Sequence, residues 1–231
     1  MVLDIDMYFH QHANWRRTLD GAKESKRQKE QLDRYLSWVS EEGGTEGPTH
    51  LDTWFKPHQH KRLEWLKSHS TGVTAEFGCN YGYVLAYCGG HIGVDWNKSS
   101  IRLAEILNPA RKFITADIRR LPLPALYADT VMLCDVLEHL RYPVDVELAV
   151  AEAMRVARAK VLITLPNGEH DTPESNSFKH QWLATSDKVK EIVAWLRHWK
   201  ISVSKTRHFV MIEAVRVKEA APDYVPDTAT A

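Results

Sequence analysis

The segment with the most chemical content is a glycine-rich turn, Glu76-Phe-Gly-Cys-Asn-Tyr-Gly82, which follows an apolar run and precedes a helical pattern. Glycines let the backbone approach a ligand at the carboxyl end of a parallel strand, where open α/β sheets bind cofactors. The turn therefore suits a nucleotide-like cofactor. A dinucleotide-binding G-x-G-x-x-G loop needs glycines where this chain has Asn80 and Tyr83, which weakens the dinucleotide interpretation. Asn80 tolerates the left-handed backbone conformation, so the turn can still form.

Two carboxylates follow the next two apolar runs. Asp95 stands seventeen residues after Gly78, where a carboxylate can accept both ribose hydroxyl protons, as in dinucleotide sites. Asp117, with an adjacent backbone amide, suits the adenine amino group and a ring nitrogen, and Trp96 suits the face of the base. Each acid taken alone can instead cap a following helix. Acids at successive strand ends favour a binding site.

A long irregular segment, residues 165–182, leaves the fifth apolar run on the ligand side of the expected sheet. Long irregular loops are usually functional or disordered. Phe178, His180 and Trp182 supply aromatic and titratable groups. These residue types favour a substrate wall over a simple linker.

Two closely spaced histidines, His58 and His60, follow Trp54-Phe55 in a segment that we expect to form the opposing lid. Protein zinc sites need three or four ligands. No carboxylate or third histidine stands at ligand spacing from this pair, so the sequence predicts no metal site.

Short apolar runs alternate with helical patterns over the central part of the chain. The runs are residues 73–77, 91–94, 112–115, 131–134 and 160–165, and the helices are residues 58–69, 81–88, 98–107 and 144–157. A β-α-β-α order throughout predicts an α/β fold whose parallel sheet has helices on both faces. A last helix, residues 186–198, precedes strands 199–204 and 207–215. Their two-residue connection predicts an antiparallel hairpin.

The chain divides into three expected parts. Residues 1–50 read as a helical extension that acts as a lid or docking element, because apolar residues recur there at helical spacing before a Gly- and Pro-rich breaker. Residues 51–217 read as the core. Residues 218–231, rich in Ala, Pro, Asp and Thr, read as a flexible tail.

Composition excludes several broad classes. The 231 residues suit one domain, and 30 basic against 30 acidic side chains give a net charge of zero, unlike a dedicated nucleic-acid binder. Cys79, Cys88 and Cys134 are odd in number and form no C-x-x-C pair, which argues against disulfides and zinc. No secretion signal or membrane span is recognisable, so we expect a cytoplasmic protein.

These motifs resemble the class I S-adenosylmethionine (SAM)-dependent methyltransferases, particularly the type 11 group, over about residues 51–217. Residues 76–82 match the family's E-x-G-C-G-x-G loop except at Asn80, and Asp95 and Asp117 match its ribose and adenine acids. The segment Ala128-Asp-Thr-Val-Met-Leu-Cys-Asp-Val-Leu-Glu-His-Leu140 resembles the family's F-D-x-V-x-x-x-x-V-L-E-H-L stretch.

The resemblance implies a Rossmann-like, seven-stranded, mostly parallel sheet, with SAM as cofactor and S-adenosylhomocysteine as product. It places residues 76–82 around the methionine part of SAM, Asp95 at the ribose and Asp117 with Ile118 at the adenine. Asp135 should face the donor pocket. The full expected donor site is Glu76, Gly78, Cys79, Asn80, Gly82, Asp95, Trp96, Asp117, Ile118 and Cys134.

Methyl transfer is a displacement at an activated sulfonium carbon, so the protein mainly aligns the acceptor. We expect an oxygen or nitrogen of a small molecule or sugar as acceptor, and no membrane partner. For a hydroxyl acceptor the candidate general bases are His139 and His180, with Asp135 behind them. His139 can instead support the pocket wall, and His180 can be an ordinary loop histidine.

Two alternatives stay open. The acceptor can be RNA or protein, docked on a helix from Arg16 to Arg34 in which seven basic residues outnumber four acidic ones. Neutral overall charge counts against nucleic acid. The chain can also be a catalytically silent SAM-binding partner of another subunit, which the intact donor-site acids disfavour.

Overall fold

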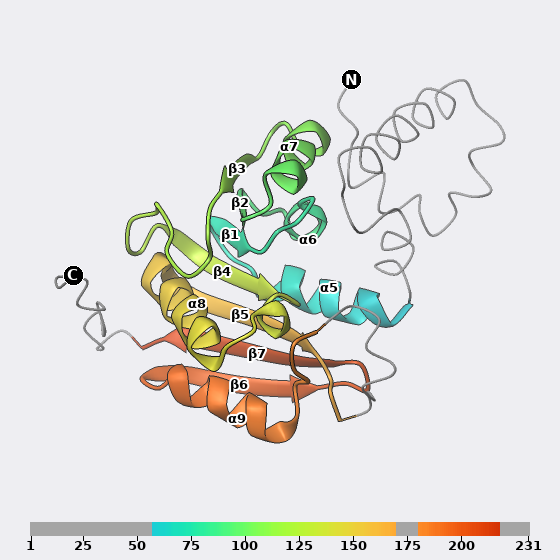
Figure 1. The fold of residues 1–231 in the computed structure, drawn as a ribbon, viewed down its shortest axis with the longest axis vertical. Coiled ribbons are helices and arrows are strands. Elements are labelled where there is room, and N and C mark those ends of the chain that lie inside the picture. The colour runs from blue at the N-terminus through green and yellow to red at the C-terminus, as the bar shows by residue number, and fades with distance from the viewer. Residues whose placement is uncertain (1–56, 170–179, 218–231) are drawn as a thin grey trace.

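A computed structural model describes residues 57–169 and 180–217 of the chain (Figure 1). The expected N-terminal extension, the lid residues 54–55, Phe178 and the whole C-terminal tail lie outside the described residues, as do the side chains of His58 and His60. Among the described residues, no helix is long and apolar enough to cross a membrane.

A seven-stranded sheet with the strand order β3-β2-β1-β4-β5-β7-β6 runs through the described chain. Strands β1 to β5 pair in parallel, and β7 pairs antiparallel with both β5 and β6. The predicted α/β fold with a C-terminal antiparallel hairpin is therefore confirmed. The strands are β1 (Thr74–Phe77), β2 (Ile92–Asp95), β3 (Lys112–Thr115), β4 (Ala128–Cys134), β5 (Ala157–Pro166), β6 (Trp199–Lys205) and β7 (Phe209–Arg216).

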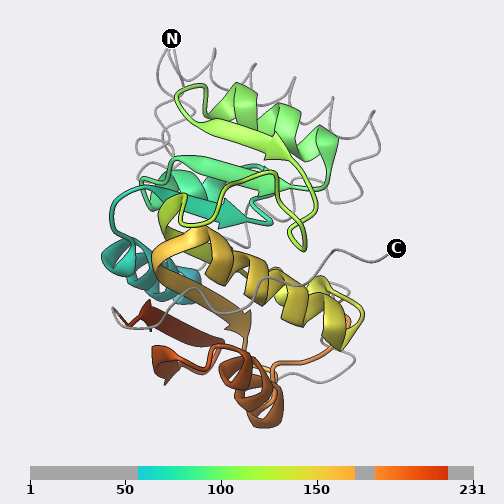
Figure 2. The same ribbon diagram turned by 90° about the vertical axis from the view of Figure 1, so that its left-hand side faces the viewer.

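Helices cover both faces of this twisted sheet (Figure 2). The apolar residues of α8 and α9 pack in one core cluster, and those of α5, α6 and α7 pack in the other. A short 3-10 helix, η1, follows β4. The helices are α5 (Pro57–His69), α6 (Tyr83–Tyr87), α7 (Lys98–Leu107), η1 (Leu137–His139), α8 (Pro143–Val156) and α9 (Ser186–Trp195).

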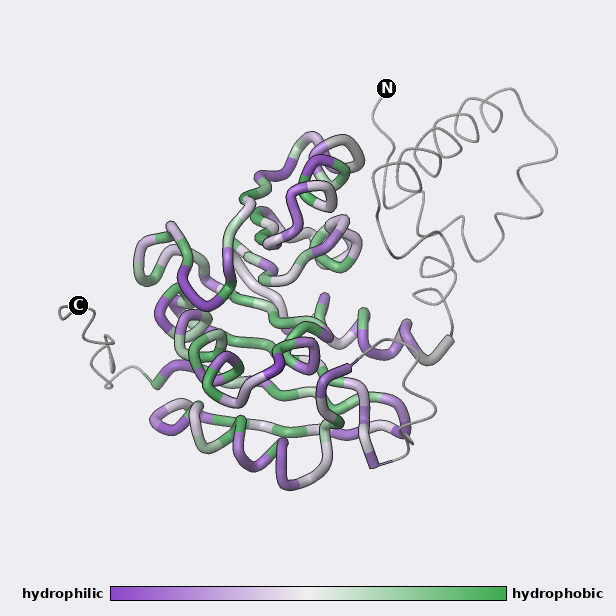
Figure 3. The backbone as a smooth tube through the Cα atoms, viewed as in Figure 1, coloured by the Kyte–Doolittle hydropathy of each residue, from purple (hydrophilic) through white to green (hydrophobic). Residues whose placement is uncertain are grey.

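The two cores follow from the alternation of side chains along a strand. In β4, Val131 and Leu133 point to the core under α8 and α9, whereas Met132 and Cys134 point to the core under α5, α6 and α7. Both faces of the central strands must therefore be apolar, as the hydrophobic colouring along them shows (Figure 3).

The expected strict alternation of strand and helix is wrong between β3 and β4. Residues 116–127 contain no helix, and Pro122 and Pro124 lack the amide hydrogens that a helix interior needs. Ala157, which the sequence pattern assigned to a helix, belongs to β5, because the pairing of β4 with β5 extends to Ala128 and Ala157. The spacing of apolar residues along the chain cannot show which strands pair with each other, so it did not reveal this end of β5.

Gly93 of β2 stands where neighbouring side chains leave no room for a Cβ atom. A Cβ atom there would lie 2.6 Å from the Phe113 ring and 2.7 Å from Cys79 Sγ. We expect Gly93→Ala to destabilise the fold by about 1–3 kcal/mol through overpacking, as measured by urea unfolding. Gly89→Ala is the control, because its Cβ meets no heavy atom within 4 Å and adds only the strain of a φ of 68°. An equal loss in both variants would contradict the packing argument.

Candidate functional site

The glycine turn after β1 is held against the end of β2. The amides of Gly78 and Cys79 both donate to the carbonyl oxygen of Val94, at 2.7 and 3.0 Å. Gly78 and Gly82 each have φ 77°, and Asn80 has φ 47°, which confirms that Asn80 takes the left-handed conformation. A Cβ on Gly78 would lie 2.3 Å from Val136 Cγ2, so a glycine lets the turn meet the segment that follows β4.

Asp95 closes the same turn from the end of β2. Its Oδ2 accepts from the amide of Asn80 and its Oδ1 from the amide of Asn97, both at 2.8 Å. Burial raises the pKa of Asp95, while those two amides act in the opposite direction. Each oxygen has a second lone pair, so Asp95 can hold the turn and still accept from a ligand. The neighbouring Trp96 is 79% exposed.

Asp117 lies beyond β3 and is fixed by Arg119, a residue without a role in the sequence prediction. The Arg119 guanidinium binds both Asp117 oxygens at 2.6–3.0 Å and also binds Asp145 at 2.7 Å. The hydrogen bond from Arg119 lowers the pKa of Asp117. Ile118, between the two, is buried. Asp117 is therefore a charged, half-exposed group of fixed orientation.

A buried ion pair joins α5 to the end of β4. The guanidinium of Arg62, with a fully buried side chain, donates to Asp135 Oδ2. Thr164 Oγ1 donates to the other Asp135 oxygen at 2.7 Å. The guanidinium also lies 4.9 Å from the centre of the Phe209 ring. Asp135 itself has φ 48°, so these contacts fix a left-handed turn after β4.

Sequence reasoning missed Arg62, although a signal was present. Arg62 precedes Leu63 and stands four residues before Leu66, so it shares the apolar face of a predicted helix. A charged residue on such a face indicates a buried partner, and here the partner is Asp135.

Glu76, at the end of β1, is 2% exposed, and its Oε2 has no hydrogen-bond partner within the described part of the chain. Burial raises the pKa of Glu76 to about 8, against opposing effects of the Leu85 amide and Arg62. An unsatisfied buried carboxyl is costly unless a ligand cation or donor reaches it. Glu76 therefore fits a ligand that carries a positive charge.

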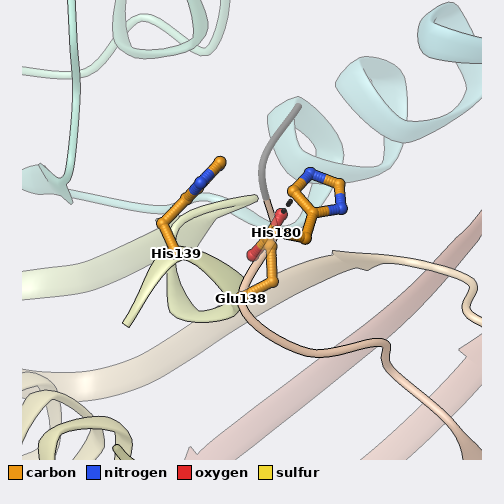
Figure 4. Close-up of side chains that lie close together, drawn as sticks. All are labelled: Glu138, His139 and His180. Atoms are coloured by element: carbon orange, nitrogen blue, oxygen red, sulfur yellow. Dashed lines mark ion pairs between the residues drawn. The ribbon is translucent and has the colours of Figure 1, made fainter. Parts of the chain in front are cut away.

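The structure brings His139 and His180 together with Glu138 (Figure 4). The two imidazole rings are 5.1 Å apart and nearly perpendicular, and His180 Nε2 lies 4.0 Å from Glu138 Oε1. Burial raises the pKa of Glu138 well above its usual range, and the nearby charge of Asp135 adds to this effect. Glu138 was part of a recognised motif, but the sequence suggested no role for it. Asp135, expected behind the histidines, is held by Arg62 and Thr164.

Cys79 and Cys134 are buried in the core cluster under α5, α6 and α7. Burial raises the pKa of both thiols well above their usual range. The two side chains therefore serve as apolar packing close to the turn rather than as thiolates.

Comparisons with known proteins agree with this architecture. A family model named Methyltransf_11, described as a methyltransferase domain, matches residues 75–165. No curated protein matches the chain significantly.

Three solved structures illustrate the likeness in fold. A SAM-dependent methyltransferase from Thermotoga maritima, described as a possible histamine N-methyltransferase, is 14% identical with a TM-score of 0.59, covering 73% of this chain and 96% of that one. One from Aquifex aeolicus is 16% identical with a TM-score of 0.56, covering 74% and 100%. The small RNA methyltransferase HEN1 is 15% identical with a TM-score of 0.61, covering 70% of this chain and 25% of that one. Identities this low establish the shared fold alone.

The ion pair between Arg62 and Asp135 yields a stability prediction. We expect Arg62→Met to destabilise the fold by about 3–5 kcal/mol, because it leaves the Asp135 charge in the interior without its cation. Arg62→Met combined with Asp135→Asn removes both charges and should recover most of this loss. Urea unfolding of both variants tests the prediction, which is wrong if the double variant is no more stable than the single one.

Glu76 yields a prediction for pH. Because its folded-state pKa of about 8 exceeds the ordinary value of 4.5, the unfolded chain loses this proton first as the pH rises. The contribution to stability is complete below pH 4.5 and is lost as the pH rises to about 8, at up to about 1.4 kcal/mol per pH unit. Unfolding free energies at pH 6, 7 and 8 should therefore fall more steeply in the ligand-free wild type than in Glu76→Gln. Parallel curves for the two proteins would assign Glu76 an ordinary pKa.

Proposed function

Because this chain carries a class I SAM-dependent methyltransferase domain, with residues 75–165 matching the family, we propose that it methylates an oxygen or nitrogen of a small molecule or sugar. SAM is the cofactor that this family implies. Bound SAM supplies a methyl group on a positively charged sulfur, already activated for displacement.

The observation that supports the proposal best is the acidic cradle at the carboxyl end of the sheet. Glu76 offers a buried oxygen without a partner among the described residues. Asp95 holds the glycine turn by accepting hydrogen bonds from the backbone amides of Asn80 and Asn97. SAM carries an ammonium group and a sulfonium, so it brings positive charge to these carboxyls. This fit comes from the residues themselves and is independent of the family match.

In this proposal each predicted donor-site residue has one task. Glu76 and the turn that contains Gly78, Cys79, Asn80 and Gly82 hold the methionine part, and Asp95 accepts from the ribose hydroxyls. Asp117 and the Ile118 amide receive the adenine edge, Trp96 covers the base, and Cys134 contributes apolar wall.

The acceptor side begins at η1. His139 is exposed, so an acceptor can reach its imidazole, and the less exposed His180 ring lies 5.1 Å from it. A neutral imidazole accepts a proton near pH 7, which suits removal of the proton from an acceptor hydroxyl. The chain otherwise has to align the acceptor with the methyl carbon and exclude water from the reaction.

Calorimetry with S-adenosylhomocysteine tests the donor site. We expect the wild type to bind this ligand and not NAD, and Asp95→Ala to weaken binding by about 1–3 kcal/mol, the loss expected when hydrogen bonds to a charged group are removed. Asp187→Ala is the matched control, because Asp187 is 91% exposed on α9 and should leave the affinity unchanged. Tighter binding of NAD than of S-adenosylhomocysteine would refute the proposed function.

A further inference from the structure

We propose that Glu138, His139 and His180 bind a divalent transition-metal ion, and that this ion holds and activates a hydroxyl group of the acceptor. The metal site is inferred from the side chains alone. Its role in methyl transfer rests on the proposed function and narrows the acceptor to an alcohol. The ion then performs the activation assigned above to a histidine base.

The three side chains offer a suitable ligand set in one place (Figure 4). Their potential ligand atoms, one carboxylate oxygen and two imidazole nitrogens, all lie within 4.8 Å of one another. Imidazole and carboxylate together suit ions such as Mn²⁺, Co²⁺ and Zn²⁺, whereas Mg²⁺ prefers oxygen ligands. Metal–ligand bonds of about 2.0–2.2 Å place the ligand atoms about 3–3.5 Å from one another. Binding an ion therefore requires these side chains to move about 1 Å closer together.

Glu138 is the residue whose buried oxygens lack a partner in the described part of the chain. It is 1% exposed, and neither of its carboxyl oxygens has a hydrogen-bond partner from another residue in the described chain. The imidazole Nε2 of His180 lies 4.0 Å from Glu138 Oε1, which is too long for a hydrogen bond. A simple ion pair with His180 would also leave the second oxygen of Glu138 without a partner among the described residues.

The surrounding charge favours a cation as well. Within the described residues, Arg62 is the one Lys or Arg that is fully buried, and it already pairs with Asp135. Glu76 and Glu138 are buried carboxyls close enough to Arg62 to interact with its charge. A divalent ion beside Glu138 would give its two buried oxygens the partner that they lack within the described chain.

Backbone contacts hold the three ligands together. The amide of Gln181 donates to the carbonyl oxygen of Glu138 at 2.8 Å, which fixes His180 beside η1. Trp182 Nε1 donates to the carbonyl oxygen of Leu140 at 3.1 Å, at the other end of η1. Such support from neighbouring hydrogen bonds is a general requirement of metal sites.

The site also lies beside the donor turn. Val136, two residues before Glu138, occupies the space that a Cβ on Gly78 would need. An ion held by η1 is therefore next to the turn that we assign to the methionine part of the cofactor.

Three protein ligands leave at least one coordination position for the acceptor. A hydroxyl bound there has a lowered pKa and loses its proton to water at neutral pH. Its oxygen then forms the bond to the methyl carbon, the carbon–sulfur bond breaks, and that electron pair remains on sulfur. The two histidines stay neutral throughout, as ligands.

The test uses the full, untagged, metal-free chain titrated with Co²⁺, followed by calorimetry and by visible absorption, which reports nitrogen and oxygen coordination. We expect one equivalent to bind, and Glu138→Gln and His139→Gln each to weaken binding by at least about tenfold. His91→Gln is the matched control, because His91 is exposed next to the amino end of β2, at the opposite edge of the sheet. His139 is itself exposed, so its variant keeps the test valid if Glu138→Gln does not fold.

Failure of this inference is distinguishable from failure of the proposed function. Absence of Co²⁺ binding at millimolar concentration, or binding that neither variant weakens, overturns the metal site. The same preparations are titrated with S-adenosylhomocysteine. If that ligand binds while Co²⁺ does not, the methyltransferase proposal stands and only the metal site is refuted.

Discussion

The buried pair of Arg62 and Asp135 is the interaction on which the site depends. It is formed by an arginine whose side chain has no exposure, so its charge has to be compensated inside the protein. Asp135 provides that compensation in a left-handed turn directly after β4, and Thr164 of β5 holds its second oxygen. The pair thus joins α5, β4 and β5 directly before η1, where we propose that the acceptor binds.

The left-handed turn at Asp135 lies at the point where the glycine turn after β1 meets the segment after β4. The strand order changes direction between β1 and β4, and crevices at such switch points are where open α/β sheets bind ligands. The glycine turn after β1 and the segment after β4 meet there, with Gly78 against Val136. The antiparallel strand β7 contributes Phe209, whose ring lies against the Arg62 guanidinium. The C-terminal hairpin therefore supports the site as well as completing the sheet.

Three carboxyl groups are buried at the carboxyl edge of the sheet: those of Glu76, Asp95 and Glu138. Burial raises the pKa values of Glu76, Asp95 and Glu138, because each ionised form is poorly solvated there. Perturbed carboxyls of this kind concentrate at functional sites. A sulfonium cofactor on the β1 side and a metal ion on the η1 side would each supply positive charge where the protein lacks it.

The sequence by itself determined the α/β class, the C-terminal hairpin, the glycine turn with a left-handed Asn80, and Asp95 at the end of β2. These features depend on periodicity and on residues close together in the chain, which a linear pattern records. Tertiary structure alone decided the partners of Arg62, the contact of Arg119 with Asp145, and the approach of His180 to Glu138. Asp135 lies 73 positions from Arg62, and His180 lies 42 positions from Glu138, so only the pairing of strands and the packing of helices bring them together. The sequence shows which side chains carry a charge, but the fold determines how far each one is buried and which partner it contacts.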